Sequence, residues 1–264
     1  MEPLDFTRAR ILNNIPAKKL EEKLSIIRDG NDTEEIKLIK QMAVNRYAAS
    51  NIPIEYWGLS IDKDFIGDLR LKEKYNEYVA DIKSSYIKGA SICFAGGHGR
   101  GKTFISTAIL KKAAQTGYSC LYSTLNDIVS ILTQASNEDK FLAKRELVMV
   151  DFLVIDELDP RFMANDKVED LFARNLEHIF RTRSSNKLPT LICTNSPNIL
   201  ESFNGSLKSS LESLMKGYME TFIVFGEDYR KYLPRKYSDE ASESLSKLKE
   251  EEEKQKIIIN KGNK

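Results

Sequence analysis

Neither positive nor negative charge predominates in this chain of 264 residues, because 40 basic side chains are balanced by 39 acidic ones for a net charge of +1. This balance excludes the overall positive field with which a strongly basic protein attracts nucleic acid. Any basic binding surface must therefore be local.

Cysteine is scarce, and no two cysteines are close in sequence. Cys93, Cys120 and Cys193 lie far apart inside apolar runs, with no Cys-x-x-Cys pair. This spacing excludes a disulfide framework and a cysteine zinc site, and it predicts three reduced, buried thiols.

Long hydrophobic runs are also lacking. None approaches the roughly 18 apolar residues that a membrane-spanning helix requires. The first residues, Met1 to Asp5, show no charged segment followed by an apolar one, as a secretion signal would. We therefore expect a soluble, cytoplasmic protein without a membrane partner.

The distribution of apolar residues predicts an α/β protein with additions at both ends. We expect a helical region over 1–60, a main domain over 61–237 and a charged, flexible or solvated tail over 238–264. Apolar runs predict five strands in a mostly parallel sheet covered by helices on both faces. The expected strands are 91–95, 118–123, 152–155, 189–194 and 221–225.

Helical periodicity and end signals predict the helices between these strands. Asp32 and Glu35 form a capping-box pattern at the start of one helix, and Gly117 is a stop signal after another. The expected helices are 17–28, one beginning after 32, 68–88, 104–114, 126–132, 139–147 and 167–183.

The residues from Gly96 to Thr103 match the phosphate-binding pattern G-x-x-x-x-G-K-S/T at every fixed position. Glycines let successive backbone N–H groups point at phosphates, and the following helix adds its positive end. Lys102 is expected to reach the β- and γ-phosphates, and the Thr103 hydroxyl to bind Mg²⁺. The sequence therefore predicts an ATP site. Its expected contacts are Gly96, Gly97, His98, Gly99, Arg100, Gly101, Lys102, Thr103 and Phe104, although Arg100 could equally be exposed to solvent.

Two acids follow the buried run 152–155. Asp156 is expected to hold Mg²⁺ through water, and Glu157 to polarise the water that attacks the γ-phosphate. The alternative is a strand that ends in solvated carboxylates. Asn195 ends another apolar run and is expected to orient that water or contact the γ-phosphate, the alternative being an ordinary Asn-Ser-Pro turn.

The order of these motifs, with Gly-Glu-Asp-Tyr-Arg at 226–230 and Arg-Tyr-Ala-Ala-Ser-Asn-Ile-Pro at 46–53, resembles the DnaC-type loaders of replicative helicases. These bacterial and phage proteins are AAA+ P-loop ATPases related to the transposition helper IstB, and the resemblance covers about residues 45–236. It implies that 1–60 binds a hexameric replicative helicase and that the ATPase self-associates in the presence of ATP.

The same resemblance implies two further sets of basic residues. Lys140, Lys144 and Arg145 are expected to contact single-stranded DNA, or else to be solvated helix charges. The resemblance also implies that an arginine from a neighbouring subunit completes the site, and that it lies shortly before the last strand. The only basic residues in that segment, 206–216, are Lys208 and Lys216, and neither is an arginine. Arg181 and Arg183 are alternatives that otherwise end a helix or lie on the surface.

Three functions therefore remain open. The first is a helicase loader in DNA replication that hydrolyses ATP to ADP and phosphate, weakly without partners. The second is an IstB-like transposition helper that forms filaments on duplex DNA. The third is a nucleotide-gated adaptor with little hydrolysis, which the lack of an arginine in 206–216 favours.

Overall fold

The computed structural model describes residues 14–159, 166–196 and 205–232. Internal contacts divide the chain into two units, Met1–Asp228 and Tyr229–Lys264. The second unit contributes one described element, the 3-10 turn η4 (Tyr229–Tyr232). The tail expected over 238–264 lies outside the described residues.

In the described part of the chain, five strands form one sheet in the order β2-β3-β4-β1-β5. Every neighbouring pair is parallel, so the predicted α/β sheet is confirmed and contains no antiparallel pair among these strands. The burial of β1, β3 and β4 along their whole length explains their continuous apolar sequences. The strands are β1 (Ser91–Ala95), β2 (Cys120–Thr124), β3 (Phe152–Asp156), β4 (Thr190–Thr194) and β5 (Met219–Ile223).

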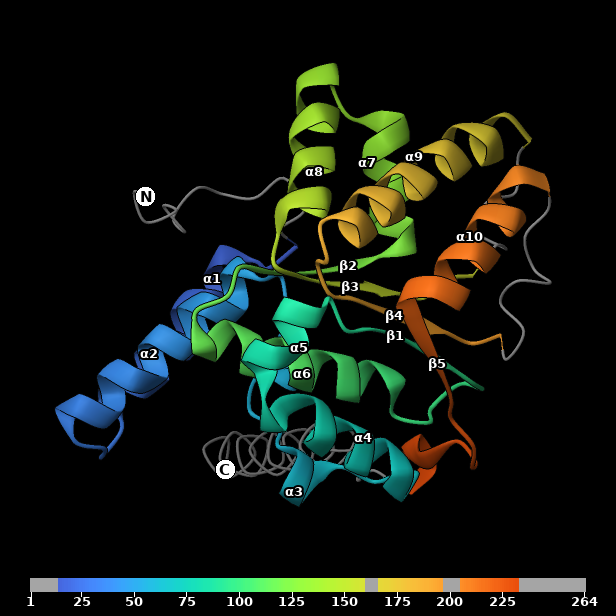
Figure 1. The fold of residues 1–264 in the computed structure, drawn as a ribbon. Coiled ribbons are helices and arrows are strands. Elements are labelled where there is room, and N and C mark those ends of the chain that lie inside the picture. The colour runs from blue at the N-terminus through green and yellow to red at the C-terminus, as the bar shows by residue number, and fades with distance from the viewer. Residues whose placement is uncertain (1–13, 160–165, 197–204, 233–264) are drawn as a thin grey trace, which may run out of the picture. The chain divides into compact units, whose positions relative to one another are not determined.

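Helices cover both faces of this sheet (Figure 1). One core joins the sheet to α7, α8 and α9, and the other joins its opposite face to α2, α4 and α6. The helices before β1 are α1 (Ala17–Asp29), α2 (Glu34–Ala49), the 3-10 turn η1 (Ile54–Tyr56), α3 (Ile61–Asp64), α4 (Leu69–Ala80) and α5 (Ile82–Lys88). The later helices are α6 (Lys102–Thr116), α7 (Leu125–Gln134), α8 (Asn137–Met149), α9 (Asp166–Ser185) and α10 (Gly205–Tyr218). Among the described residues, none of these helices is both long and apolar enough to cross a bilayer.

The single helix predicted over 68–88 is wrong, because the structure divides it at Asp81. This residue has φ −136° and ψ 78°, outside the helical region, and its carboxylate accepts a hydrogen bond from the Ser84 backbone N–H at 2.9 Å. An aspartate favours this capping geometry over the middle of a helix because its side chain competes for backbone donors. The apolar periodicity continues across the break and hides it in the sequence.

The start of α2 also differs from the predicted capping box. Thr33, one residue later than expected, is the N-cap, and its hydroxyl accepts from the Ile36 backbone N–H at 3.4 Å. Asp32 instead forms an ion pair with Lys40. Either side chain suits an N-cap, so the sequence alone does not choose between these neighbours.

The end of α2 and the segment that follows it pack into the same core as α6. Tyr47, Ile52 and Trp57 are buried there together with Ile105 and Ile109 of α6. Earlier in α2, by contrast, several apolar side chains are exposed, namely Ile36, Leu38, Ile39 and Met42. The helical region before β1 therefore has one part built into the α/β core and another part that presents apolar surface.

Candidate functional site

The glycine loop connects β1 to α6 at the carboxyl edge of the sheet. Gly96 has φ +155°, and a Cβ atom added to it would lie 2.4 Å from the carbonyl oxygen of Val224. Gly101, the residue before α6, has φ +87° and no side chain that could cap the helix. The first N–H groups of α6 therefore have no side-chain cap from Gly101, which suits them to bind an anion.

Lys102 is buried, and its side chain turns back into the loop. Its amino group donates to the carbonyl oxygens of Gly96 at 2.9 Å and Gly97 at 2.8 Å. It also donates to the side-chain oxygen of Asn195 at 2.9 Å. Asn195 follows β4, which pairs with β1 so that Ala95 is opposite Thr194. The sheet thus brings together two site residues that were predicted from separate motifs.

Asp156 is the last residue of β3 and is buried at the same edge. One of its carboxylate oxygens accepts from the Tyr122 hydroxyl at 2.8 Å, and the other accepts from the Glu157 backbone N–H at 2.7 Å. Burial and the charge of Asp156 raise the pKa of Tyr122, so its hydroxyl keeps its proton and acts as the donor. Tyr122 was not predicted as a site residue, because its only signal in the sequence is its position near the end of an apolar strand.

Glu157 has the left-handed backbone conformation, with φ +53°, which is strained for a residue with a side chain. Partial desolvation raises its pKa, and the negative charges of Asp156 and Asp127 raise it further. His98, which is exposed, acts in the opposite direction. A less acidic carboxylate is a better acceptor for a proton from water, which suits Glu157 to a role as a base.

The remaining predicted loop contacts differ in their surroundings. Thr103 is half-buried in the first turn of α6. Phe104 packs against Tyr56 and Phe65, with ring centroids 6.2 and 5.5 Å away. Arg100 donates to the carbonyl oxygen of Val224 at 2.9 Å. The aromatic contacts of Tyr56 and Phe65 were missed because their segment precedes β1 by many residues.

Arg183 is not a surface cation, and this alternative for the catalytic arginine is wrong. Its side chain is fully buried, and burial lowers its pKa to about 9. The guanidinium donates to five oxygens that belong to the end of α8 and the starts of β3 and β4. They are the carbonyls of Leu147, Val150, Asp151 and Pro189 and the hydroxyl of Thr190, at 2.7–3.2 Å.

The other candidate cations are accessible. Arg181 is exposed, forms an ion pair with Glu177 at 2.8 Å and approaches the Ser210 hydroxyl at 3.3 Å. Lys208 is half-buried and Lys216 is exposed, both on α10. The helix α10 itself was not among the helices predicted from the sequence.

The predicted DNA-contact residues lie on α8. Lys140 and Lys144 are half-buried, while Arg145 is exposed. Phe141 is exposed one turn before Arg145, so an aromatic side chain lies beside these basic residues. Phe141 was not predicted as a contact residue, although its position among basic residues is visible in the sequence.

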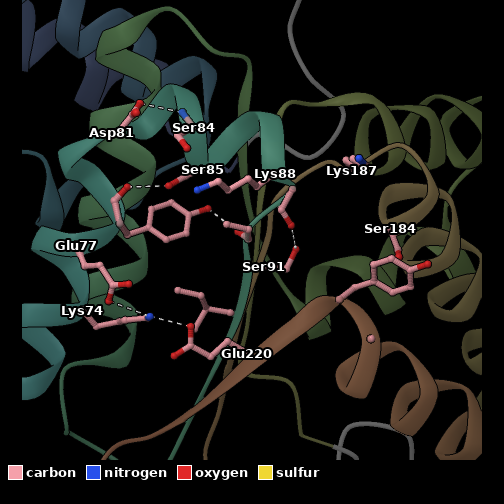
Figure 2. A pocket seen from close by; sticks show the side chains of 16 residues that line it. Lys74, Glu77, Asp81, Ser84, Ser85, Lys88, Ser91, Ser184, Lys187 and Glu220 are labelled. Atoms are coloured by element: carbon pink, nitrogen blue, oxygen red, sulfur yellow. Dashed lines mark hydrogen bonds and ion pairs between the residues drawn. The ribbon is translucent and has the colours of Figure 1, made fainter.

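A pocket of about 540 Å³ lies at the opposite, amino-terminal edge of the sheet (Figure 2). Lys74 lies there between Glu77 at 3.1 Å and Glu220 at 2.7 Å. Lys88 and Lys187 also line the pocket, together with Asp81, so basic and acidic side chains balance. None of the glycine-loop residues lines it, so this pocket is separate from the predicted nucleotide site.

Residues 67–195 match the protein-family profile described as IstB-like ATP binding protein. The replicative helicase loader DnaC of Escherichia coli strain K12 is 31% identical over 135 residues, which cover 49% of this chain and 51% of that protein. This chain therefore spans about half the length of the curated relatives that it matches.

Two solved structures of similar fold agree with this match. A crystal structure of DnaI has a TM-score of 0.53 at 18% identity and covers 67% of this chain and 93% of its own. A crystal structure of the DnaC helicase loader has a TM-score of 0.51 at 18% identity and covers 66% of this chain and 100% of its own. At this identity the two matches show that the chain shares their fold. Over about half of its length, the chain is therefore similar to the IstB-like ATP-binding proteins and to the DnaC helicase loader, as its motifs predicted.

Proposed function

We propose that this chain is an ATP-dependent loader that binds a hexameric replicative helicase and delivers it onto single-stranded DNA. The contact between Lys102 and Asn195, at the same sheet edge as Asp156, is the observation that carries the ATPase part of the proposal. The similarity to the DnaC loader supports the helicase and DNA parts.

The glycine loop and the start of α6 bind the triphosphate through backbone N–H groups. Lys102 exchanges its carbonyl acceptors in the loop for phosphate oxygens, which carry full negative charge. The aromatic cluster of Phe104, Phe65 and Tyr56 lies beside this loop, because a Cβ atom on Gly101 would contact the Phe65 ring at 2.7 Å. An aromatic surface there suits the flat face of a purine base.

The donor set at this edge fits Mg²⁺. Thr103 offers a hydroxyl in the first turn of α6, and Asp156 offers a buried carboxylate at the end of β3. Oxygen ligands of this kind are those that Mg²⁺ prefers beside a triphosphate. When bound, the metal neutralises charge on the β- and γ-phosphates.

Glu157 accepts a proton from the water that attacks the γ-phosphate, and Asn195 orients that water or the γ-phosphate itself. A cation from a neighbouring subunit, Lys208 or Lys216, stabilises the charge that develops on the transferred phosphoryl group. ATP-dependent self-association is then required for full turnover, and a chain alone is a weak ATPase.

Nucleotide binding and phosphate release test this site. The parent should bind Mg-ATP and release phosphate when single-stranded DNA and the helicase are present. Lys102→Ala should lose binding, whereas Glu157→Gln should bind ATP but not turn it over. Normal ATP binding by Lys102→Ala would refute the site. A parent that binds ATP but releases no phosphate under these conditions would instead support a nucleotide-gated adaptor.

The exposed apolar side chains of α2 support a partner surface in the 1–60 region. Removing this whole region would also remove Tyr47, Ile52 and Trp57 from the α/β core, so point substitutions are a cleaner test. Leu38→Ser with Ile39→Ser should abolish co-purification with a hexameric helicase without unfolding the ATPase. Asn45→Ser, at an exposed position of the same helix, should leave it intact.

Single-stranded DNA is proposed to bind along α8, at Lys140, Lys144 and Arg145. The exposed Phe141 supports this proposal, because unpaired bases stack on aromatic side chains next to cations. Phe141→Ala should weaken binding of an oligonucleotide at all salt concentrations. Arg145→Ala should also reduce the salt dependence of binding. The slope of log K against log salt concentration should become shallower by about 0.7 for each lost phosphate contact. Lys18→Ala, which removes an exposed charge on α1, should change neither.

A transposition helper is the second candidate, because the matching family profile is described as IstB-like. It predicts ATP-dependent filaments on duplex DNA and co-purification with a transposase. The near-neutral charge of the chain favours the loader instead.

A further inference from the structure

Tyr122 connects the carboxylate proposed to serve Mg²⁺ with the segment that precedes the ATPase core. Its side chain and its backbone make these contacts separately. The hydroxyl donates to Asp156 at 2.8 Å across from β2 to β3. Both residues are more than nine-tenths buried, so bulk water cannot easily replace this bond.

The backbone of Tyr122 is held from the other side by Ser50 and Asn51. β2 is an edge strand of the sheet, and its outer edge faces this segment. The Tyr122 N–H donates to the Ser50 carbonyl at 2.8 Å, and the Asn51 side-chain N–H donates to the Tyr122 carbonyl at 3.0 Å. The segment after α2 thus forms hydrogen bonds with the outer edge of β2.

Asn51 reaches further toward the amino terminus. Its side-chain oxygen accepts from the Asn14 backbone N–H at 2.8 Å, close to the start of α1. Its backbone has φ +54°, a left-handed conformation that asparagine tolerates better than most residues. Hydrogen bonds at its backbone and at its side chain therefore make Tyr122 the covalent link between Asn51, which also binds Asn14, and Asp156.

The contacts of Asp156 explain what Tyr122 can contribute. Each carboxylate oxygen has room for two hydrogen-bond donors, and one position on each is filled, by Tyr122 and by the Glu157 N–H. The carboxylate is thereby held in one orientation while it retains acceptor capacity for a water of a hydrated cation. Preorganisation of this kind increases affinity because less freedom is lost on binding.

We propose that Tyr122 is a positioning residue that orients Asp156 for Mg²⁺, and that Asn51 makes this orientation depend on how the amino-terminal segment is attached to β2. The inference rests on the proposed Mg-ATP site and deepens it. A partner that displaces the amino-terminal segment would then change how strongly Mg²⁺ enhances ATP binding.

The first experiment compares ATP affinity in Mg²⁺ with ATP affinity in EDTA by titration calorimetry. The ratio of the two is the gain due to Mg²⁺. Tyr122→Phe removes only the hydroxyl and should reduce this gain by about 3- to 10-fold, while the affinity in EDTA changes by less than about 2-fold. An unchanged gain would overturn the proposal. An increased gain would also overturn it, because it would mean that the hydroxyl competes with the metal.

Tyr86→Phe is the matched control. The Tyr86 hydroxyl donates to Asp151 at 2.9 Å, so this variant also removes a tyrosine–aspartate hydrogen bond, but before the opposite end of β3. It should leave the Mg²⁺ gain as in the parent. An equal loss in both variants would show a general effect on the sheet and would refute a specific role for Tyr122.

The second experiment tests the connection to Asn51. Asn51→Gly keeps the left-handed backbone accessible and removes both side-chain hydrogen bonds. It should lower the Mg²⁺ gain by about 2- to 5-fold, and the double variant with Tyr122→Phe should lose less than the product of the two single effects. Lys187→Gly, at an exposed residue with φ +52°, is the control and should have no effect. The connection would be refuted if the double variant lost the full product of the two single effects on the Mg²⁺ gain. It would also be refuted if Asn51→Gly left that gain unchanged.

These outcomes are distinct from failure of the site itself. If the parent shows no Mg²⁺-dependent ATP binding, the proposed function is wrong. If the parent shows the gain and Lys102→Ala loses binding, but Tyr122→Phe behaves as the parent, only the inference about Tyr122 is wrong.

Discussion

The amino group of Lys102 lies 2.9 Å from the side-chain oxygen of Asn195, which is 93 residues later in the sequence. One residue begins the helix after the glycine loop and the other follows β4. Because β4 lies next to β1, a change at the phosphate-binding loop and a change at Asn195 are expected to affect each other directly.

Asn195→Ala should separate binding from catalysis. Without Asn195, Lys102 still has the two loop carbonyls as acceptors in the free protein and phosphate oxygens when ATP binds, so Mg-ATP affinity should change by less than about 3-fold. Hydrolysis should fall by about 10²-fold, since the group that orients the attacking water is lost. Single-turnover phosphate release measures this effect, and Asn126→Ala, at an exposed position of α7, is the control. A loss confined to binding would contradict the assigned role.

Gly96→Ala should disrupt the glycine loop. The added methyl group would lie 2.4 Å from the Val224 carbonyl, and φ is +155°, so the backbone has to move. We expect ATP binding to weaken by more than about 10-fold in titration calorimetry. Gly58→Ala, where an added methyl group meets nothing within 4 Å, should bind ATP as the parent does.

Arg183→Met should lower the stability of the fold rather than slow the catalytic step. It leaves buried carbonyls at the end of α8 and the starts of β3 and β4 without their donor, which should lower the free energy of unfolding by roughly 3 kcal/mol or more. Urea unfolding measures the change. Arg181→Met breaks an exposed ion pair and should cost less than about 1 kcal/mol. Equal effects of the two substitutions would contradict the structural role of Arg183.

Lys111 should make the free energy of unfolding depend on pH in the alkaline range. Its amino group donates to the carbonyls of Tyr56, at 2.6 Å, and Leu59, and burial lowers its pKa from 10.5 to about 8. Between these two values the unfolded chain binds more protons at this site than the folded protein does, so the contribution of Lys111 to stability rises with pH.

Lys111→Met removes this titration. The difference in unfolding free energy between parent and variant should therefore shift in favour of the parent from about pH 7 to about pH 10, as measured by urea unfolding at each pH. A difference that is constant over this range would show that the lysine keeps its ordinary pKa.

The sequence by itself determined the elements whose signals are local. The glycine loop, the buried strands and the Gly117 helix stop were all predicted from short patterns, and Gly117 indeed ends α6 with φ +102°. Such features depend on backbone freedom and on apolar residues within a few positions of one another, which the sequence displays directly.

Only the tertiary structure decided the contacts between segments. The hydroxyl of Tyr122 reaches Asp156 because β2 and β3 are neighbours in one particular register, with Thr124 opposite Asp156. Arg183 is buried rather than exposed because the end of α8 and the starts of two strands converge on it. Strand order and register are set by packing of the whole core, and no local pattern in the sequence encodes which distant residues will meet.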